Sequence, residues 1–278
     1  MSVIGTRITD LWVRFLARTR FQRVNRFLFQ LSIRGLGILN YRNSKESGER
    51  HFLQRLLRCY SGSGVTTGLV ILDVGANVGD YSRAILDIAP TARIYCFEPH
   101  PGNVKRLEAA VGGRVTVVPM AVGSKRGTAE LYDYVEGAGS SHASLHKDVF
   151  EKLRQRAHQS LCVNMTTIDD FVEQHSIAAI TLLKVDVEGH ELEVFRGASK
   201  AIRERKVDIV HFEFNEMNVI TRVFLADFFA LLPGFVFYRL LPDGWIPVTD
   251  GPMENLFAFQ NIVAVRVGVP AFSMFAAG

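Results

Sequence analysis

The sequence predicts an α/β fold with a mainly parallel, Rossmann-like sheet, a C-terminal antiparallel pair of strands and an N-terminal helical extension. Residues 69–72 form an apolar run, too short for a helix, that leads into a glycine-rich turn and a helical segment. Similar runs then alternate with helical segments, which is typical of parallel strands joined by helical crossovers. Two more runs, residues 235–240 and 261–267, have little helix between them and indicate an antiparallel pair.

Length and charge limit the class of protein. The chain has 278 residues, of which 48% are hydrophobic, enough for one α/β domain with an extension. Residues 1–60 hold twelve Lys or Arg and three acids, whereas the other 218 residues carry a net charge of −5. A nucleic-acid-binding body should be basic around its site, so we expect no nucleic-acid partner. The three widely spaced cysteines show neither metal nor redox spacing, which favours a reducing cytoplasm.

Residues 1–48 predict a basic amphipathic extension, and residues 49–278 the main domain. Apolar residues recur at helical spacing in residues 8–16 and 21–33, on faces that one continuous helix could not align, so we expect two helices broken near Thr19. These stripes can cap the domain, or they can lie on an anionic membrane. We favour the cap, with a secondary peripheral contact of residues 1–40 at the inner membrane face.

The remaining strands and helices are predicted from hydrophobic periodicity and from residues that typically cap or end an element. Residues 135–145 are rich in Gly and Ser and are expected to be mobile, and Thr167 with Asp170 resembles a helix capping box. We expect further strands at residues 94–97, 115–118, 128–134, 161–165, 180–185 and 207–212, of which 128–134 and 161–165 could pair. We expect further helices at residues 47–60, 81–88, 103–111, 149–158, 167–175 and 222–232, and one after Glu191 that runs through Val194 toward Arg203 with a kink near Gly197.

The turn after the first strand predicts a nucleotide-binding crook. Gly75 and Gly79 allow a sharp bend and the close approach of a ligand, and Asn77 between them tolerates positive φ. The spacing differs from the dinucleotide fingerprint G-x-G-x-x-G and suits S-adenosylmethionine better than NAD. Asp73 can meet the ammonium group of the methionine part, and Glu98, at the tip of the second strand, stands where ribose hydroxyls are bound.

Acids stand at the carboxyl ends of four predicted strands, where open α/β sheets bind their ligands. They are Asp73, Glu98, Asp186 and Glu213. Lys184 shares a strand face with Asp186 and needs a carboxylate partner, although it could simply brace the acids. His190 and His211 flank the same edge, and a histidine there could accept a hydroxyl proton.

Six segments in order make the sequence resemble the FkbM family of methyltransferases over roughly residues 49–267. They are VILDVGANVGDYS, YCFEPHP, VPMAVGSKRGTAELY, GSSHASL, TTIDDF and LLKVDVEGHELEVFRGA. The resemblance implies a class I S-adenosylmethionine-dependent fold and O-methyl transfer to a hydroxyl of a sugar, glycan or polyketide. It implies cofactor-binding roles for Asp73, Gly75, Asn77, Gly79, Glu98, Ala121 and Asp186, and a reaction centre lined by Asp186, Glu188, Gly189 and His190, with Glu213 nearby.

Several alternatives stay open on the sequence alone. The acceptor hydroxyl needs a base or a metal, and Asp186, Glu188 and Glu213 could bind a divalent ion or act without one, with Asp186 or His190 as base. An NAD-dependent oxidoreductase would share the first two strands. A non-catalytic module that docks a membrane or a partner could retain a vestigial fold.

Overall fold

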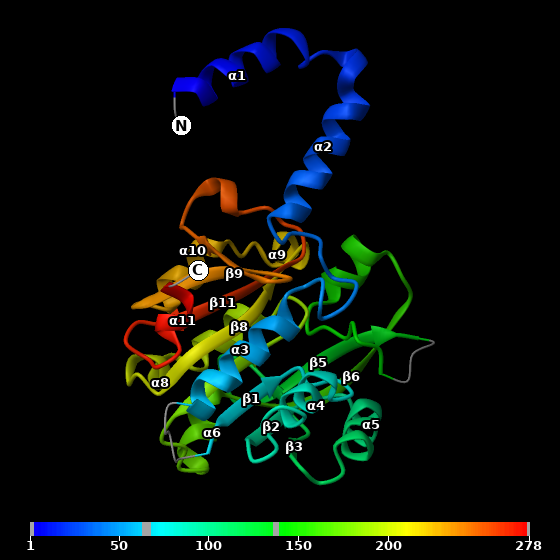
Figure 1. Cartoon of the computed structure of the whole chain (residues 1–278). Helices are drawn as coiled ribbons and strands as arrows, with labels where there is room; N and C mark the ends of the chain where they lie inside the picture. Colours follow the sequence, from blue (N-terminus) through cyan, green and yellow to red (C-terminus); the bar gives the residue numbers. More distant parts are fainter. Residues whose placement is uncertain (1–2, 63–67, 136–138, 277–278) are drawn as a thin grey trace.

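The central sheet confirms the predicted α/β fold (Figure 1). The computed structural model describes residues 3–62, 68–135 and 139–276. Within these ranges one sheet has eight strands in the order β10-β9-β11-β8-β7-β1-β2-β3. Their bounds are β1 (Val70–Val74), β2 (Arg93–Phe97), β3 (Thr116–Val118), β7 (Ile180–Val185), β8 (Val207–Phe214), β9 (Phe235–Leu241), β10 (Gly244–Val248) and β11 (Gln260–Arg266).

The strand directions agree with the prediction. Strands β3, β2, β1, β7 and β8 are parallel, and β11 runs antiparallel to both β8 and β9. The edge strand β10 was not predicted, because it lies in the Pro- and Gly-rich segment 242–252. Pro247 is tolerated there, since an edge strand has one side without ladder hydrogen bonds.

Helices cover both faces of the sheet. In β1, Val70, Leu72 and Val74 pack into the core on one face, and Ile71 packs into the core on the other. The first face is covered by α6 (Ile168–Gln174), α7 (Glu191–Arg196), α8 (Ser199–Arg203) and α10 (Leu225–Leu231). The second is covered by α3 (Glu49–Gly62), α4 (Asp80–Leu86), α5 (Pro101–Val111) and α11 (Phe272–Ala276). Burial on both faces explains why β1 is a continuous apolar run up to Asp73.

A second, three-stranded sheet lies beside the first. It consists of β4 (Ala121–Val122), β6 (His158–Thr166) and β5 (Gly127–Tyr134), and β5 and β6 pair as expected, in the antiparallel direction. The predicted helix 149–158 is too long: it covers Val149–Arg154, and Gln155 at φ +49° ends it. Residues 136–138 of the loop expected to be mobile lie outside the described residues, whereas the loop from Gly139 onward is held by hydrogen bonds to Asp133.

Some of the predicted boundaries of the helices on the first face of the sheet are confirmed, and others are wrong. Thr167 caps α6 as predicted, with its Oγ1 accepting from the Asp170 N–H at 3.0 Å. The expected kink near Gly197 is a break between α7 and α8. The helix predicted from residue 222 begins only at Leu225, after a short unpredicted helix α9 (Met217–Thr221).

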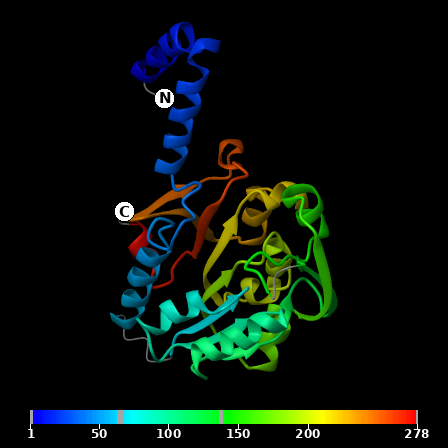
Figure 2. The same ribbon diagram turned by 90° about the vertical axis from the view of Figure 1, so that its right-hand side faces the viewer.

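The two N-terminal helices project from the body, as Figures 1 and 2 both show. α1 (Val3–Phe15) and α2 (Gln22–Gly35) are separated by a short turn at Thr19–Phe21, near the predicted break. The predicted cap over the site is wrong, because the apolar stripes of both helices are exposed and Ile33 is the buried residue of α2. No helix in the described part of the chain is long and apolar enough to cross a membrane. The cytoplasmic location and the domain boundary at residue 48 stay predictions.

Candidate active site

The glycine-rich turn brings two strand ends into contact. The backbone N–H groups of Gly75 and Ala76 both donate to the carbonyl of Phe97, at 2.9 and 3.0 Å. Gly75 has φ +85°, and a Cβ at this position would lie 1.8 Å from the carbonyl oxygen of Asp186. Sequence reasoning reserved this space for a ligand. In the structure the neighbouring backbone itself requires glycine, because no side chain fits against the turn after β7.

Glu98 is fixed by the turn it faces. Its carboxylate accepts hydrogen bonds from the backbone N–H groups of Asn77 (3.0 Å) and His100 (2.8 Å). Asn77 has φ +48°, as its place between two glycines predicted. Burial raises the pKa of Glu98, and these hydrogen bonds oppose that rise. The turn and the carboxylate therefore form one preorganised unit. Gly79 (φ +86°) then begins α4.

A first pocket opens beside Glu98 with mixed polar and apolar walls. Ala121 and Asp186 both lie in its wall. Its apolar lining also includes Phe97, Met120, Leu131 and Leu145. A carboxylate among apolar walls matches a nucleoside, whose ribose hydroxyls donate hydrogen bonds and whose base is flat and apolar on its faces.

A second pocket, of about 550 Å³, has six acids in its described wall. They are Glu49, Asp73, Asp80, Asp87, Asp186 and Glu213, and Arg50, Lys184 and Tyr81 also lie in the wall. Such an acidic wall suits a ligand that carries positive charge, as the methionine part of S-adenosylmethionine does. Sequence reasoning missed Glu49 and Tyr81, since neither has a local signal.

Lys184 lies at the centre of this acidic wall, 3% exposed. Its Nζ is 3.4 Å from Asp186 Oδ2 and 3.8 Å from Glu49 Oε1, which confirms the predicted ion pair with Asp186. Although burial lowers the pKa of Lys184, Asp186 and Glu49 raise it above its ordinary value. Nζ makes no hydrogen bond within the described ranges, so this buried donor can still bond a ligand atom.

Asp73 and His211 lie deeper on the same face. Ser82 Oγ donates to Asp73 Oδ2 at 2.6 Å, and burial raises the pKa of Asp73 to about 6. His211 is wholly buried, with Nδ1 2.9 Å from the Tyr81 hydroxyl and Nε2 3.1 Å from Asn261 Oδ1. Burial lowers the pKa of His211 well below its ordinary value, so this ring is neutral. His211 therefore holds the Tyr81 hydroxyl in place through this hydrogen bond.

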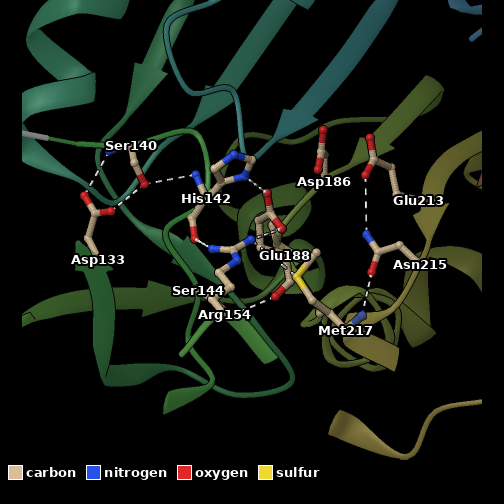
Figure 3. Close-up of polar contacts among 12 residues, drawn as sticks. Asp133, Ser140, His142, Ser144, Arg154, Asp186, Glu188, Glu213, Asn215 and Met217 are labelled. Atoms are coloured by element: carbon tan, nitrogen blue, oxygen red, sulfur yellow. Dashed lines mark hydrogen bonds and ion pairs between the residues drawn. The ribbon is translucent and has the colours of Figure 1, made fainter. Parts of the chain in front are cut away.

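A third pocket, of about 740 Å³, lies beyond Asp186. Its wall combines Glu213 and Glu216 with Tyr41, Phe257 and Phe259. Burial first, and then the charge of Asp186, raise the pKa of Glu213 well above its ordinary value. Asn215 Nδ2 lies 3.5 Å from Glu213 Oε2, and Asn215 Oδ1 accepts the Met217 N–H at 3.0 Å. Figure 3 shows this chain of contacts.

Glu188 is held on both oxygens by residues that sequence reasoning missed. His142 Nδ1 lies 3.1 Å from Oε1, and Arg154 donates to Oε2 at 3.1 Å (Figure 3). The Ser144 hydroxyl donates to the backbone carbonyl of Glu188 at 2.8 Å. Glu188 thus fastens the loop from Gly139 to the strand-end turn. Both oxygens have a partner, and Glu188 also lines the first and the third pocket.

His190 does not line any of the three pockets. Its Nδ1 lies 3.1 Å from His146 Nε2, and burial and His146 lower its pKa to about 4. Its neighbour Glu191, 1% exposed, accepts from the backbone N–H groups of Val187 and Gly189, both at 3.1 Å. The pattern KVDVEGHE therefore places Asp186 and Glu188 in the pocket walls, while His190 lies outside them and Glu191 holds the turn.

The donor set gives no support to a metal centre. Among the described residues no group of three or more His, Cys, Asp or Glu side chains could hold an ion. Of the three acids suggested from the sequence, Glu188 is already engaged by Arg154 and His142.

Known proteins resemble this chain in sequence. The model of the methyltransferase FkbM domain matches residues 73–231, more than half of the chain. The chain is 26% identical over 189 residues to the 2-O-methyltransferase NoeI of Sinorhizobium fredii, covering 63% of this chain and 75% of that protein. It is 29% identical to the hexuronic acid methyltransferase AglP of Haloferax volcanii, covering 51% and 54%. It is also 29% identical to the 31-O-demethyl-FK506 methyltransferase FkbM of Streptomyces tacrolimicus, covering 56% and 71%.

Solved structures also resemble the chain. The crystal structure of the methyltransferase FkbM from Methylobacillus flagellatus aligns with 78% of this chain and 51% of its own, at 16% identity and a TM-score of 0.43.

Proposed function

Because this chain belongs to the FkbM family of S-adenosylmethionine-dependent methyltransferases, we propose that it is an O-methyltransferase for a hydroxyl of a sugar, glycan or polyketide-type acceptor. One observation carries the proposal. Gly75, Asn77 and Asp186 line all three pockets, so these pockets meet at a single point. Two pockets fit the two ends of the cofactor, and the third is free for an acceptor beside Asp186. Family membership also disfavours the NAD-dependent and non-catalytic alternatives.

The cofactor supplies an activated methyl group. The protein therefore has to bind the cofactor, align the acceptor and remove the proton of the acceptor hydroxyl. Glu98 would hold the ribose, the apolar walls around Ala121 the adenine, and the acidic wall around Asp73 and Glu49 the methionine part. The donor sets fit, since Glu98 has its backbone partners in place and the second wall is acidic.

Asp186 and Glu213 are the pair that accepts the hydroxyl proton. Both line the second and the third pocket, and their charges interact. The raised pKa of Glu213 brings this carboxyl group closer to neutral pH, where a carboxyl base is most effective. His190 lies outside the pockets and has no part in this transfer.

The walls of the third pocket support a hydroxylated ring as the acceptor. Tyr41, Phe257 and Phe259 offer apolar faces, while Asn215 and Glu216 offer hydrogen-bonding groups. This mixture matches a sugar or macrolide-like ring, which has apolar C–H faces and hydroxyl edges. The printed names of the relatives include a 2-O-methyltransferase, a hexuronic acid methyltransferase and a 31-O-demethyl-FK506 methyltransferase.

Mass spectrometry of a glycan and polyketide panel, incubated with methyl-deuterated S-adenosylmethionine, tests the proposal. We expect one acceptor to gain a labelled methyl group on oxygen. Asp186→Asn should keep the cofactor affinity measured by titration calorimetry and lower kcat by about 10²-fold or more. His190→Gln is the matched control, with a change of less than about tenfold expected. An equal loss of binding and rate in Asp186→Asn would make Asp186 a cofactor residue instead.

A further inference from the structure

Each of the two projecting helices carries a stripe of exposed apolar side chains. In α1 and α2 the stripes are spaced as i, i+3, i+4 and i+7, and every member is exposed. Their members are Ile8, Leu11, Trp12 and Phe15 in α1 and Val24, Phe27, Leu28 and Leu31 in α2. The exposed fractions of Trp12 and Phe27 are 40% and 58%. Burial of this apolar surface would stabilise any complex that covers it, so we expect the stripes to contact a partner.

The stripe of α2 points away from the body. Ile33, the buried residue of α2, is nine positions after Val24, which at 100° per residue places it on the opposite side of the helix. The side chain of Asn25 also bonds the carbonyl of Leu16 at 2.9 Å, which ties the end of α1 to α2. The body of the protein therefore cannot cover this stripe unless α2 loses its packing contact at Ile33.

Arginines flank both stripes on one side. Arg7 and Arg14 lie roughly 100–120° from Ile8 around α1, and Arg23 and Arg34 lie roughly 80–100° from Val24 around α2. Residues 3–36 contain seven arginines and a single acid, Asp10. An apolar stripe with arginines along its border matches a membrane interface, where apolar groups enter the acyl boundary and guanidinium groups stay among the phosphates. A second copy of this chain would bring the same positive charge and be repelled.

We propose that α1 and α2 dock this protein on the surface of an anionic phospholipid membrane. The apolar stripes enter the boundary between headgroups and acyl chains, and the flanking arginines contact lipid phosphates. α2 leads into the segment whose Leu39 and Tyr41 line the third pocket. At 1.5 Å per residue α2 is about 21 Å long, so docking holds this pocket close to the lipid surface.

Co-sedimentation of the full chain with vesicles tests the docking. Phosphatidylcholine vesicles with and without phosphatidylglycerol are compared at low and high salt. We expect binding to the anionic vesicles that salt weakens. Arg7→Gln combined with Arg14→Gln should lower the partition coefficient by about 5-fold per arginine. Trp12→Ser combined with Phe27→Ser should lower it by roughly tenfold or more.

Matched variants on the body separate docking from non-specific adhesion. Arg55→Gln with Arg58→Gln removes two exposed arginines of α3, and Val219→Ser with Met253→Ser removes two exposed apolar side chains. These should bind as wild type does, and all variants should keep the wild-type unfolding temperature. The proposal fails if helix and body variants bind equally, or if neutral vesicles bind as well. It also fails if the chain forms a dimer that Trp12→Ser and Phe27→Ser dissociate without any vesicle binding.

Discussion

The cofactor side and the acceptor side of the site are built in different ways. On the cofactor side, Gly75, Asn77 and Glu98 lie within 24 consecutive residues and are joined by backbone hydrogen bonds. On the acceptor side, the third pocket takes residues from distant segments that include those around Tyr41, His142, Glu213 and Phe259. A local motif preorganises the first side, whereas tertiary packing assembles the second. The two sides should therefore fail separately when mutated.

The largest expected effect is at Gly75, where the two sides touch. Gly75→Ala places a Cβ 1.8 Å from the Asp186 carbonyl oxygen at φ +85°, so we expect the free energy of unfolding to fall by more than about 3 kcal/mol. Gly234→Ala is the matched control, because Gly234 has φ +80° and no atom within 4 Å of its would-be Cβ. That variant should lose only about 1 kcal/mol. Urea unfolding measures both, and equal losses would show that the contact with Asp186 is unimportant.

The sequence identified the residues that line the first pocket more completely than those that line the third, for a physical reason. Asp73 lies in β1, Asn77 in the turn that follows it and Glu98 directly after β2, so period and strand ends determine their place. Arg154 is the last residue of the short helix Val149–Arg154, and only the tertiary fold brings it to Glu188. His142 lies in the GSSHASL segment that the family resemblance marked, but nothing local gave it a role.

The N-terminal helices show the same limit. Their period and break near Thr19 were predictable, because local spacing determines helices. Their packing was not, since an amphipathic stripe contains no information about what covers it. The stripes could have packed on the domain or on a membrane, and the sequence could not distinguish these two alternatives. The predicted cap was the wrong one of the two.

The next largest effect is expected at Glu98, and it tests whether the cofactor side can be impaired without the acceptor side. Glu98→Gln keeps the side-chain volume and removes the charge-assisted hydrogen bonds. We expect the dissociation constant of S-adenosylmethionine to rise tenfold to a hundredfold, roughly the value of hydrogen bonds to a charged group. The KM of the acceptor and kcat at saturating cofactor should stay within about twofold of wild type. A lower kcat at saturation would show that the cofactor side also shapes the transition state.

A pH-dependent effect is expected at Glu191, which holds the turn between Asp186 and His190. Burial raises the pKa of Glu191 from 4.5 to about 7. The folded state then binds the proton more tightly than the unfolded chain does. The contribution of Glu191 to stability is therefore complete below about pH 4.5 and is lost as the pH rises through about 7.

Glu191→Gln should remove this loss, because its amide oxygen can still accept from Val187 and Gly189. We expect equal stability of variant and wild type at low pH, and a variant more stable by about 1–3 kcal/mol above neutral pH. Urea unfolding on both sides of this range measures the difference. A variant less stable at every pH would show that the turn needs the carboxylate itself.

The smallest expected effect is at Arg154 and concerns the acceptor side alone. Arg154 donates to Glu188 Oε2 and to the carbonyl of His142, so it fixes the loop that borders the third pocket. Arg154→Gln leaves Glu188 with one partner fewer and loosens that loop. We expect the acceptor KM to rise about tenfold, the value of one hydrogen bond to a charged group, with cofactor affinity unchanged. Arg196→Gln, which breaks an exposed ion pair with Glu193, is the control and should change neither constant. If Arg154→Gln weakened cofactor binding as much as acceptor binding, the two sides of the site would be one cooperative unit, and their separation would be wrong.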